Sequence, residues 1–166
     1  YVGNWPGVTV EKVEGKVRGR DGVTVTDLPG IYSLSPYTPE EVVSRTYLLS
    51  GEPSAVLNIV DASNIERNLY LTTQLMELGK PVVIALNMID VVNKKGDKIN
   101  VEKLSSLLGC KVVETSALKG KGIDKACEKA CLEAEKGNSF DIRPCFSADV
   151  EEAVSAVSEL LPSEIK

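Results

Sequence analysis

Residues 81–90 constrain the fold more than any other part of the chain. They read Pro-Val-Val-Ile-Ala-Leu-Asn-Met-Ile-Asp, an aliphatic run that ends abruptly at a polar Asn-x-x-Asp. Parallel strands that are buried on both faces have this pattern. In open α/β sheets, ligands bind outside the carboxyl ends of the strands. The run therefore predicts a buried parallel strand with Asn87 and Asp90 at a ligand-binding edge.

A carboxylate at this edge suits one nucleobase in particular. Asp90 can accept two parallel hydrogen bonds, and guanine offers its N1–H and its 2-amino group side by side. Adenine has no such pair and would leave a buried carboxylate without a partner, which is a large penalty. The pattern has a second interpretation, in which Asp90 caps a helix that begins at residue 91 after an ordinary core strand.

Short apolar runs alternate with helical patterns along the rest of the chain. Strands are expected at residues 8–17, 23–26, 55–60, 81–87 and 111–115, and helices at residues 39–49, 64–78, 101–108, 123–135 and 147–161. Thr38 and Glu41 predict a capping box at the first of these helices, and Asn100 predicts a cap at the third. Residues 1–7 have loop chemistry, and residues 91–98 suggest a charged surface excursion. The order predicts an α/β fold with one mostly parallel sheet, one antiparallel strand and helices on both faces.

A second polar loop, Asp27-Leu28-Pro29-Gly30, follows the strand expected at residues 23–26. In an Asp-x-x-Gly loop the aspartate can reach a Mg²⁺ ion, usually through water. The glycine N–H can meet a terminal phosphate, because glycine allows close approach. The alternative interpretation is a plain exit from a strand into a turn, which Asp, Pro and Gly also favour.

A third polar loop begins at Ser116 and Ala117, after the strand expected at residues 111–115. In a mostly parallel sheet, all three loops lie at the same edge. Chance agreement of three loops with one ligand is much less common than any single match. Together they predict a guanine-nucleotide site.

Composition narrows the classes of protein to which the chain can belong. The chain has 166 residues, 43% of them hydrophobic, which fits one packed domain with a small appendage. Its net charge of −5 gives no basic footprint for nucleic acid, so no nucleic-acid partner is expected. The absence of histidine excludes a histidine general base and a Ser-His triad within the chain. Cys127 and Cys131 share a helix face, and buried structural thiols are favoured over a redox or metal role.

These three loops, in this order, resemble those of the Ras-like GTPases. Residues 2–12, 27–35 and 60–71 resemble the cytosolic G domain of FeoB-type ferrous iron transporters more closely. The third segment, Val-Asp-Ala-Ser-Asn-Ile-Glu-Arg-Asn-Leu-Tyr-Leu, is specific to that family. The resemblance implies a three-layer α/β/α G domain over residues 1–133. Residues 134–166 resemble the start of the helical domain that follows it.

The resemblance also implies site residues near the start of the chain. Thr9 corresponds to the switch I threonine, which binds Mg²⁺ and takes part in GTP hydrolysis, and Gly7 and Val8 adjoin it at the nucleotide. Gly3, Asn4 and Trp5 fall in the loop that covers an activating K⁺, to which Gly3 and Trp5 would offer backbone groups.

The other implied contacts lie in the three polar loops. Asp27 corresponds to the Mg²⁺ side of switch II, Gly30 to the γ-phosphate contact that takes part in catalysis, and Leu28 and Pro29 lie between them. The guanine box is Asn87, Met88 and Asp90. Ser116 supports Asp90, and the Ala117 N–H would meet guanine O6.

Three departures from the general GTPase pattern have consequences. Met88 stands where many relatives have lysine, and its aliphatic stem can cover part of the base. Ile31 replaces the glutamine that orients water, so hydrolysis would rely on backbone groups and K⁺, with slow intrinsic turnover. No Gly-x-x-x-x-Gly-Lys-Ser/Thr occurs. We therefore expect an N-terminally truncated piece that lacks the central first strand and the P-loop, which carry the main phosphate contacts.

The expected function is the GTPase module of a ferrous iron transporter, coupling GTP binding and hydrolysis to Fe²⁺ uptake. The implied ligands are GTP or GDP, Mg²⁺ and K⁺. The implied partners are the transporter's own membrane domain, at the cytoplasmic face of the inner membrane, and a second copy of the chain. One alternative is another Ras-like GTPase that lacks the glutamine. Such a protein would be expected to carry a basic RNA-binding appendage, and the net charge of −5 argues against one. A non-hydrolysing interaction module is the other.

Overall fold

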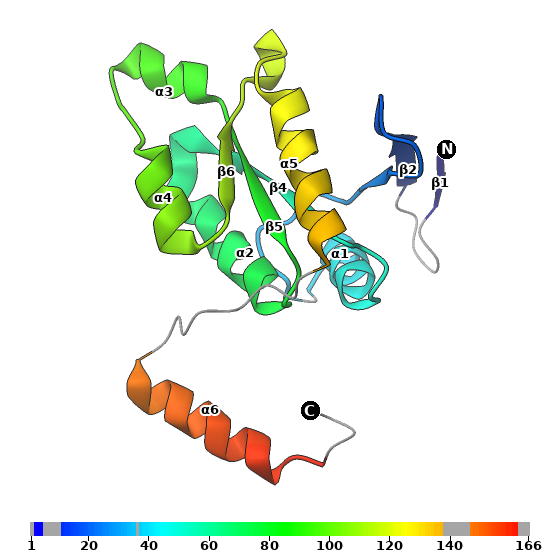
Figure 1. The fold of residues 1–166 in the computed structure, drawn as a ribbon, viewed down its shortest axis with the longest axis vertical. Coiled ribbons are helices and arrows are strands. Elements are labelled where there is room, and N and C mark those ends of the chain that lie inside the picture. The colour runs from blue at the N-terminus through cyan, green and yellow to red at the C-terminus, as the bar shows by residue number, and fades with distance from the viewer. Residues whose placement is uncertain (1, 5–10, 36, 138–146, 163–166) are drawn as a thin grey trace.

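The computed structural model describes residues 2–4, 11–35, 37–137 and 147–162. Its strands form two sheets of three (Figure 1). The parallel sheet has the order β4-β5-β6, with β4 at Val56–Asp61, β5 at Val82–Asn87 and β6 at Lys111–Glu114. The antiparallel sheet has the order β1-β2-β3, with β1 at Val2–Asn4, β2 at Glu11–Lys16 and β3 at Thr24–Asp27.

Strand β5 is the centre of the parallel sheet and of the core. Residues 82–86 are all buried, as the aliphatic run predicts. Its neighbours are in parallel register, with Asp61 of β4 opposite Asn87 and Leu86 opposite Glu114 of β6. The three strands therefore end at nearly the same level, and the chain segments that follow them start from one edge.

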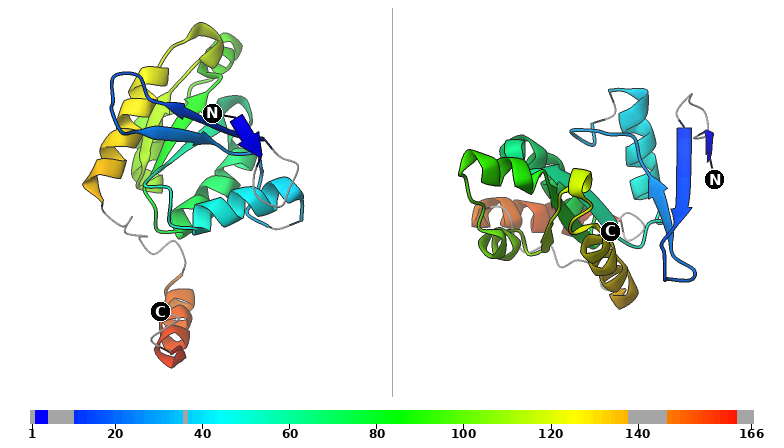
Figure 2. Two further views of the ribbon diagram at one scale, coloured as in Figure 1. Left: turned by 90° about the vertical axis from the view of Figure 1, so that its right-hand side faces the viewer. Right: turned by 90° about the horizontal axis from the view of Figure 1, so that it is seen from above.

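Helices cover both faces of this sheet, which confirms the three-layer arrangement (Figures 1 and 2). Ile84 and Leu86 pack into a cluster with residues from α2, α3 and α4. The intervening Ala85 packs against Ala126 of α5 on the opposite face. These helices are α2 at Ile65–Glu77, α3 at Ile89–Lys95, α4 at Val101–Leu108 and α5 at Ile123–Lys136.

In the described strands the parallel and antiparallel parts of the expected sheet are separate. Strand β3 pairs with β2 but not with β4, so the antiparallel strands form a separate sheet beside the parallel one (Figure 2). The hairpin closes through its own turn, where Gly19 and Gly22 adopt positive φ angles of 73° and 80°. Val25 of β3 and Ile59 of β4 are 50% and 67% exposed, because neither packs into a core that the two sheets share.

The start of the chain and the segment after β5 also differ from the sequence expectation. Strand β1 lies within the region expected to be a loop, and α3 overlaps the expected surface excursion at residues 91–98. Asp90 does not cap α3, because the N-cap position is Met88, which has a left-handed φ of 63°. Asp90 instead lies in the first turn, where a carboxylate interacts favourably with the helix dipole.

Two predicted helix caps are confirmed. Helix α1 spans Pro39–Leu49, and Thr38 and Glu41 form the expected capping box, each side chain accepting from the other's backbone N–H at 3.2 and 3.0 Å. Asn100 caps α4 by accepting from the Lys103 N–H at 2.9 Å. The sequence therefore sets these two helix starts locally.

Helix α6, at Ala148–Leu160, stands apart from the two sheets and has no buried residue (Figure 1). Val150, Val154 and Val157 recur at helical spacing and are 43%, 56% and 57% exposed. None of the helices in the described part of the chain has the length and apolar character needed to cross a bilayer.

Candidate guanine-nucleotide site

The predicted base-binding residues meet at the carboxyl end of the parallel sheet. Asn87 ends β5, Asp90 lies in the first turn of α3, and Ser116 and Ala117 follow β6. The Ala117 N–H donates to Asn87 Oδ1 at 3.0 Å. Ser116 Oγ donates to Asp90 Oδ1 at 2.9 Å. The structure thus brings these four residues together from two adjacent strand ends.

Backbone hydrogen bonds continue the pairing of β5 and β6 into the two loops. The Thr115 N–H donates to Leu86 O at 2.8 Å, and the Ile89 N–H donates to Thr115 O at 3.4 Å. The left-handed conformation of Met88 turns the chain from strand to helix between these contacts. The relative position of the two loops therefore follows from the strand pairing, which the aliphatic run sets.

A glycine closes the second loop. Ser116 and Lys121 form an antiparallel bridge, and Gly122 follows with a φ of 76°. A Cβ atom at Gly122 would lie 2.1 Å from the backbone oxygen of Glu114, at the end of β6. Only glycine lets the start of α5 approach the strand this closely.

The carboxylate of Asp90 is held in its ionised form. Its hydrogen bond from Ser116 is the main cause that lowers its pKa, followed by contact with Lys119, whose Nζ lies 3.2 Å from Asp90 Oδ2. Partial burial acts in the opposite direction. The site therefore presents a fixed negative charge at neutral pH, as pairing with two N–H donors requires.

The second predicted loop lies at the end of the other sheet. Asp27 ends β3 and is exposed, and Leu28 packs against the apolar cluster that includes Leu48 of α1. Pro29 O accepts from Ser44 Oγ at 3.2 Å, and no heavy atom lies within 4 Å of a Cβ built on Gly30. Within the described ranges, no hydrogen bond or ion pair joins residues 27–30 to the Asn87–Asp90 loop or to Ser116.

The chain after Gly30 is hydrogen-bonded to α1 and α2. The Leu34 N–H donates to Gln74 Oε1 at 2.9 Å, and Arg45 donates to Leu34 O at 3.3 Å. The guanidinium carbon of Arg67 lies 3.9 Å from the centroid of the Tyr32 ring. No sequence pattern predicted these contacts, although Arg67 and Tyr32 both lie in segments that carry the family resemblance.

Several predicted site residues lie outside the described part of the chain, namely Trp5, Gly7, Val8 and Thr9. Gly3 lies in β1 opposite Lys12 of β2, so the prediction that it belongs to a loop is wrong. Among the residues that the structure does describe, no group of three or more His, Cys, Asp or Glu side chains could hold a metal ion.

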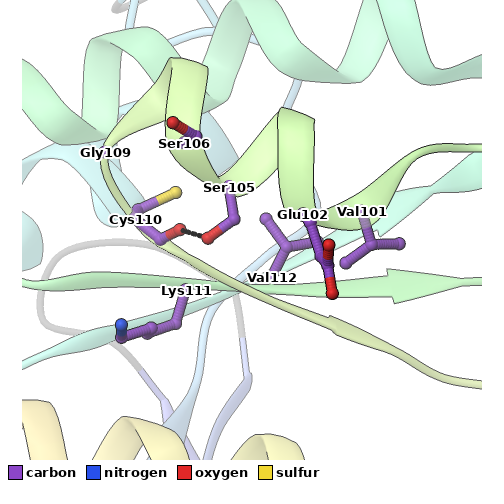
Figure 3. A pocket seen from close by; sticks show the side chains of 8 residues that line it. All are labelled: Val101, Glu102, Ser105, Ser106, Gly109, Cys110, Lys111 and Val112. Atoms are coloured by element: carbon purple, nitrogen blue, oxygen red, sulfur yellow. Dashed lines mark hydrogen bonds between the residues drawn. The ribbon is translucent and has the colours of Figure 1, made fainter.

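A surface hollow of about 480 Å³ lies between α4 and β6, away from the predicted loops (Figure 3). Ser105 Oγ donates to the backbone oxygen of Cys110 at 2.6 Å at its wall. Burial raises the pKa of the Cys110 thiol to about 11, which keeps it protonated and unreactive. The Cys110 thiol therefore supplies no reactive thiolate to the hollow.

Comparisons with known proteins agree with the resemblance. The sequence model of the family described as ferrous iron transport protein B matches residues 1–130. The chain is 45% identical over 170 residues to an Fe(2+) transport protein A/Fe(2+) transporter FeoB fusion protein from Porphyromonas gingivalis, covering 99% of this chain and 20% of that protein. It is 40% identical over 169 residues to the Fe(2+) transporter FeoB of Escherichia coli K12, covering 99% and 22%. The chain spans about a fifth of the length of these curated relatives.

Solved structures show the same fold. An S. thermophilus NFeoB variant bound to GDP is 53% identical, with a TM-score of 0.90, covering 98% of this chain and 63% of that chain. NFeoB from S. thermophilus bound to mGMPPNP is 54% identical, with a TM-score of 0.84, covering 97% and 60%. These likenesses confirm the predicted α/β class and its Ras-like arrangement.

Proposed function

Because the chain belongs to the ferrous iron transport protein B family, we propose that it is the guanine-nucleotide-binding module of a ferrous iron transporter. In this proposal, GTP binding and hydrolysis are coupled to Fe²⁺ uptake. The main support for guanine-nucleotide binding is that four predicted base-binding residues converge at one edge of the sheet, namely Asn87, Asp90, Ser116 and Ala117. The NFeoB structures bound to GDP and mGMPPNP support the same ligand class.

Base recognition would use the Asp90 carboxylate and the Ala117 N–H. The two carboxylate oxygens would accept from guanine N1–H and the 2-amino group, while Ser116 keeps the carboxylate oriented. The Ala117 N–H would donate to guanine O6. Since that N–H donates to Asn87 Oδ1 in the structure, base binding would exchange one acceptor for another. Adenine would present an amino group to the Ala117 N–H and no paired donors to Asp90.

On the phosphate side, Asp27 suits a Mg²⁺ ion that arrives with the nucleotide. Mg²⁺ usually keeps several waters and takes one or two carboxylates together with phosphate oxygens. The exposed carboxylate of Asp27 fits that role, with Thr9 as the second expected ligand. The ion would neutralise phosphate charge. The open space at Gly30 would let its N–H approach a terminal phosphate.

The K⁺ contacts that the resemblance implies are backbone groups of Gly3 and Trp5. Gly3 lies in the β1–β2 ladder, and Trp5 is outside the described ranges. Potassium activation therefore stays a prediction, and no step is derived through it. Ile31 has no group that could orient water, so we propose a slow intrinsic rate that depends on backbone donors.

The larger architecture is also part of the proposal. Residues 1–133 would form the G domain, and residues 134–166 would begin a helical domain. The exposed valine stripe of α6, Val150, Val154 and Val157, supports this division, because such a stripe suits packing by further helices. The named relatives are Fe(2+) transporters several times longer than the chain, so we propose the transporter's membrane domain as its partner, at the cytoplasmic face of the inner membrane. A second copy of the chain is a further proposed partner.

A titration with fluorescent GDP and ADP analogues tests base recognition. With Mg²⁺ present, we expect the GDP analogue to bind at least ~100-fold more tightly than the ADP analogue, because adenine leaves Asp90 unpaired. Equal binding of the two analogues would overturn the proposal.

Phosphate release from GTP, measured in K⁺ and in Na⁺ buffer, tests hydrolysis. We expect slow release that is faster in K⁺, and equal rates would remove K⁺ from the proposal.

A further inference from the structure

The Asp90 carboxylate has a partner from its own chain on each oxygen. Oδ1 accepts from Ser116 Oγ at 2.9 Å, and Oδ2 lies 3.2 Å from Lys119 Nζ. Ser116 is 2% exposed, whereas the Lys119 side chain is 44% exposed. Ser116 therefore holds the carboxylate from the protein side, and Lys119 reaches it from the solvent side.

A base can approach this carboxylate only from the solvent side, where the ammonium group of Lys119 lies. Guanine brings one donor for each oxygen, so one of its donors must compete with Lys119 for Oδ2. Lys119 ends the short η2 helix at Ala117–Lys119. A lysine ammonium sits on a flexible four-carbon stem, so it can leave the carboxylate without a change in the backbone.

We propose that Lys119 determines how strictly the site separates guanine from hypoxanthine, by serving as the alternative partner of one Asp90 oxygen. Hypoxanthine has the N1–H but lacks the 2-amino group. With hypoxanthine bound, Lys119 stays on the second oxygen and removes the penalty of an unpaired carboxylate oxygen. With guanine bound, the 2-amino group replaces Lys119, which gives up its ion pair. Both effects narrow the difference in affinity between the two bases.

The chain offers a matched control two residues away. Lys121 is exposed and lies in the same loop, where its backbone pairs with Ser116. Within the described residues its side chain makes no ion pair. Lys121→Met therefore removes the same charge from the same loop without touching Asp90, while Lys119→Met removes the charge that contacts the carboxylate.

The test is a competition assay in which GDP and IDP displace a fluorescent GDP analogue from the wild-type chain and both variants. We expect Lys119→Met to bind GDP more tightly and IDP no better. The ratio of the two dissociation constants should widen roughly two- to fivefold, the scale of a partly exposed ion pair. Lys121→Met should keep the wild-type ratio, and Lys119→Arg, which retains the charge, should stay close to it.

Two outcomes of this assay would overturn the inference. One is an unchanged GDP-to-IDP ratio in Lys119→Met, and the other is an equal widening in Lys121→Met, which would show a general effect of loop charge. The inference rests on the proposed function, and the two fail differently. If the wild-type chain binds neither GDP nor IDP, the proposed function fails as well. If the wild type binds GDP and only the ratio test fails, the proposed function stands.

A measurement without nucleotide checks the premise. NMR titration of the Asp90 side-chain carboxyl should give a higher pKa in Lys119→Met than in the wild type, because Lys119 contributes to the lowered pKa. An unchanged pKa would show that the ion pair does not form in solution and would overturn the inference. Thermal unfolding of each variant verifies that it is folded.

Discussion

The two sheets differ in how firmly their strands position the predicted nucleotide-binding residues. The parallel sheet has β5 at its centre, buried from residue 82 to residue 86. Asn87 ends that strand, and Asp90 lies three residues further on in α3. The antiparallel sheet ends at Asp27, and three of the four residues of β3 are exposed. The residues proposed to recognise the base are therefore fixed by the core. Asp27 and Gly30 depend on contacts such as the hydrogen bond from Ser44 to Pro29 O. The residues proposed for base recognition and those proposed for phosphate binding are thus positioned by different sheets.

The largest expected difference between the sheets is in core packing. Ile84→Ala empties a fully buried position in β5, so we expect it to lower the free energy of unfolding by roughly 2–5 kcal/mol. Val25→Ala in β3 removes methyl groups from a half-exposed side chain and should cost less than about 0.5 kcal/mol. Urea denaturation measures both. Equal losses in the free energy of unfolding would show that β5 and β3 contribute alike to the core, against the contrast drawn between the two sheets.

A smaller effect is expected where β4 is tied to α2. Asn58 Nδ2 donates to Thr72 Oγ1 at 2.8 Å, and Thr72 is completely buried. Thr72→Ala leaves the buried amide of Asn58 without its acceptor, so we expect a loss of about 1–3 kcal/mol in the free energy of unfolding. Thr73→Ala is the matched control, because its hydroxyl is exposed and bonds Tyr70 O within the same helix. If both variants unfold at the same denaturant concentration, the buried pair does not stabilise the sheet.

A still smaller effect is expected at the ion pair between the hairpin and α5. Arg20 Nη1 lies 2.9 Å from Glu135 Oε1, and the two side chains are 29% and 60% exposed. Arg20→Ala should lower stability by at most about 1 kcal/mol, with the difference shrinking as salt screens the charges. Arg18→Ala serves as the control, because Arg18 makes no ion pair with any described residue. A loss above 2 kcal/mol would mean that the hairpin depends on this contact.

The weakest expected signature is the pH dependence of the Asp90 cluster. The folded chain lowers the pKa of Asp90 below its ordinary value of 3.8, so the cluster stabilises the fold above that pH. This contribution is lost as pH falls through the lower, folded-state pKa. Ser116→Ala removes the main cause of the shift and should therefore have a smaller loss of stability between pH 5 and pH 2. Denaturation curves across that range provide the comparison, and identical slopes for the two proteins would contradict it.

Much of the parallel layer could be predicted from the sequence because its signals are local. The aliphatic run at residues 81–87 specifies β5, and parallel pairing then brings Asp90 and Ser116 to one edge. Thr38 and Asn100 mark helix starts through their own caps. These predictions needed only residues close together in the sequence and one rule about sheet edges.

The remaining features depend on contacts between distant segments. Whether β3 pairs with β4 is decided by which strands lie side by side, and no pattern within either strand encodes that choice. The left-handed conformation of Met88, which starts α3 earlier than expected, is rare for a residue other than glycine. The pairing of Lys119 with Asp90 joins residues of two loops, so their positions in the sequence alone give no sign of it.

Calorimetric titration of GDP into Asp90→Ala shows whether the edge of the parallel sheet recognises guanine through Asp90. We expect an affinity at least ~100-fold below that of the wild type, with the fold intact. Asp97→Ala, an exposed carboxylate just beyond α3, should bind GDP as the wild type does. If Asp90→Ala bound GDP with an affinity within about twofold of the wild type, guanine recognition would lie elsewhere in the chain.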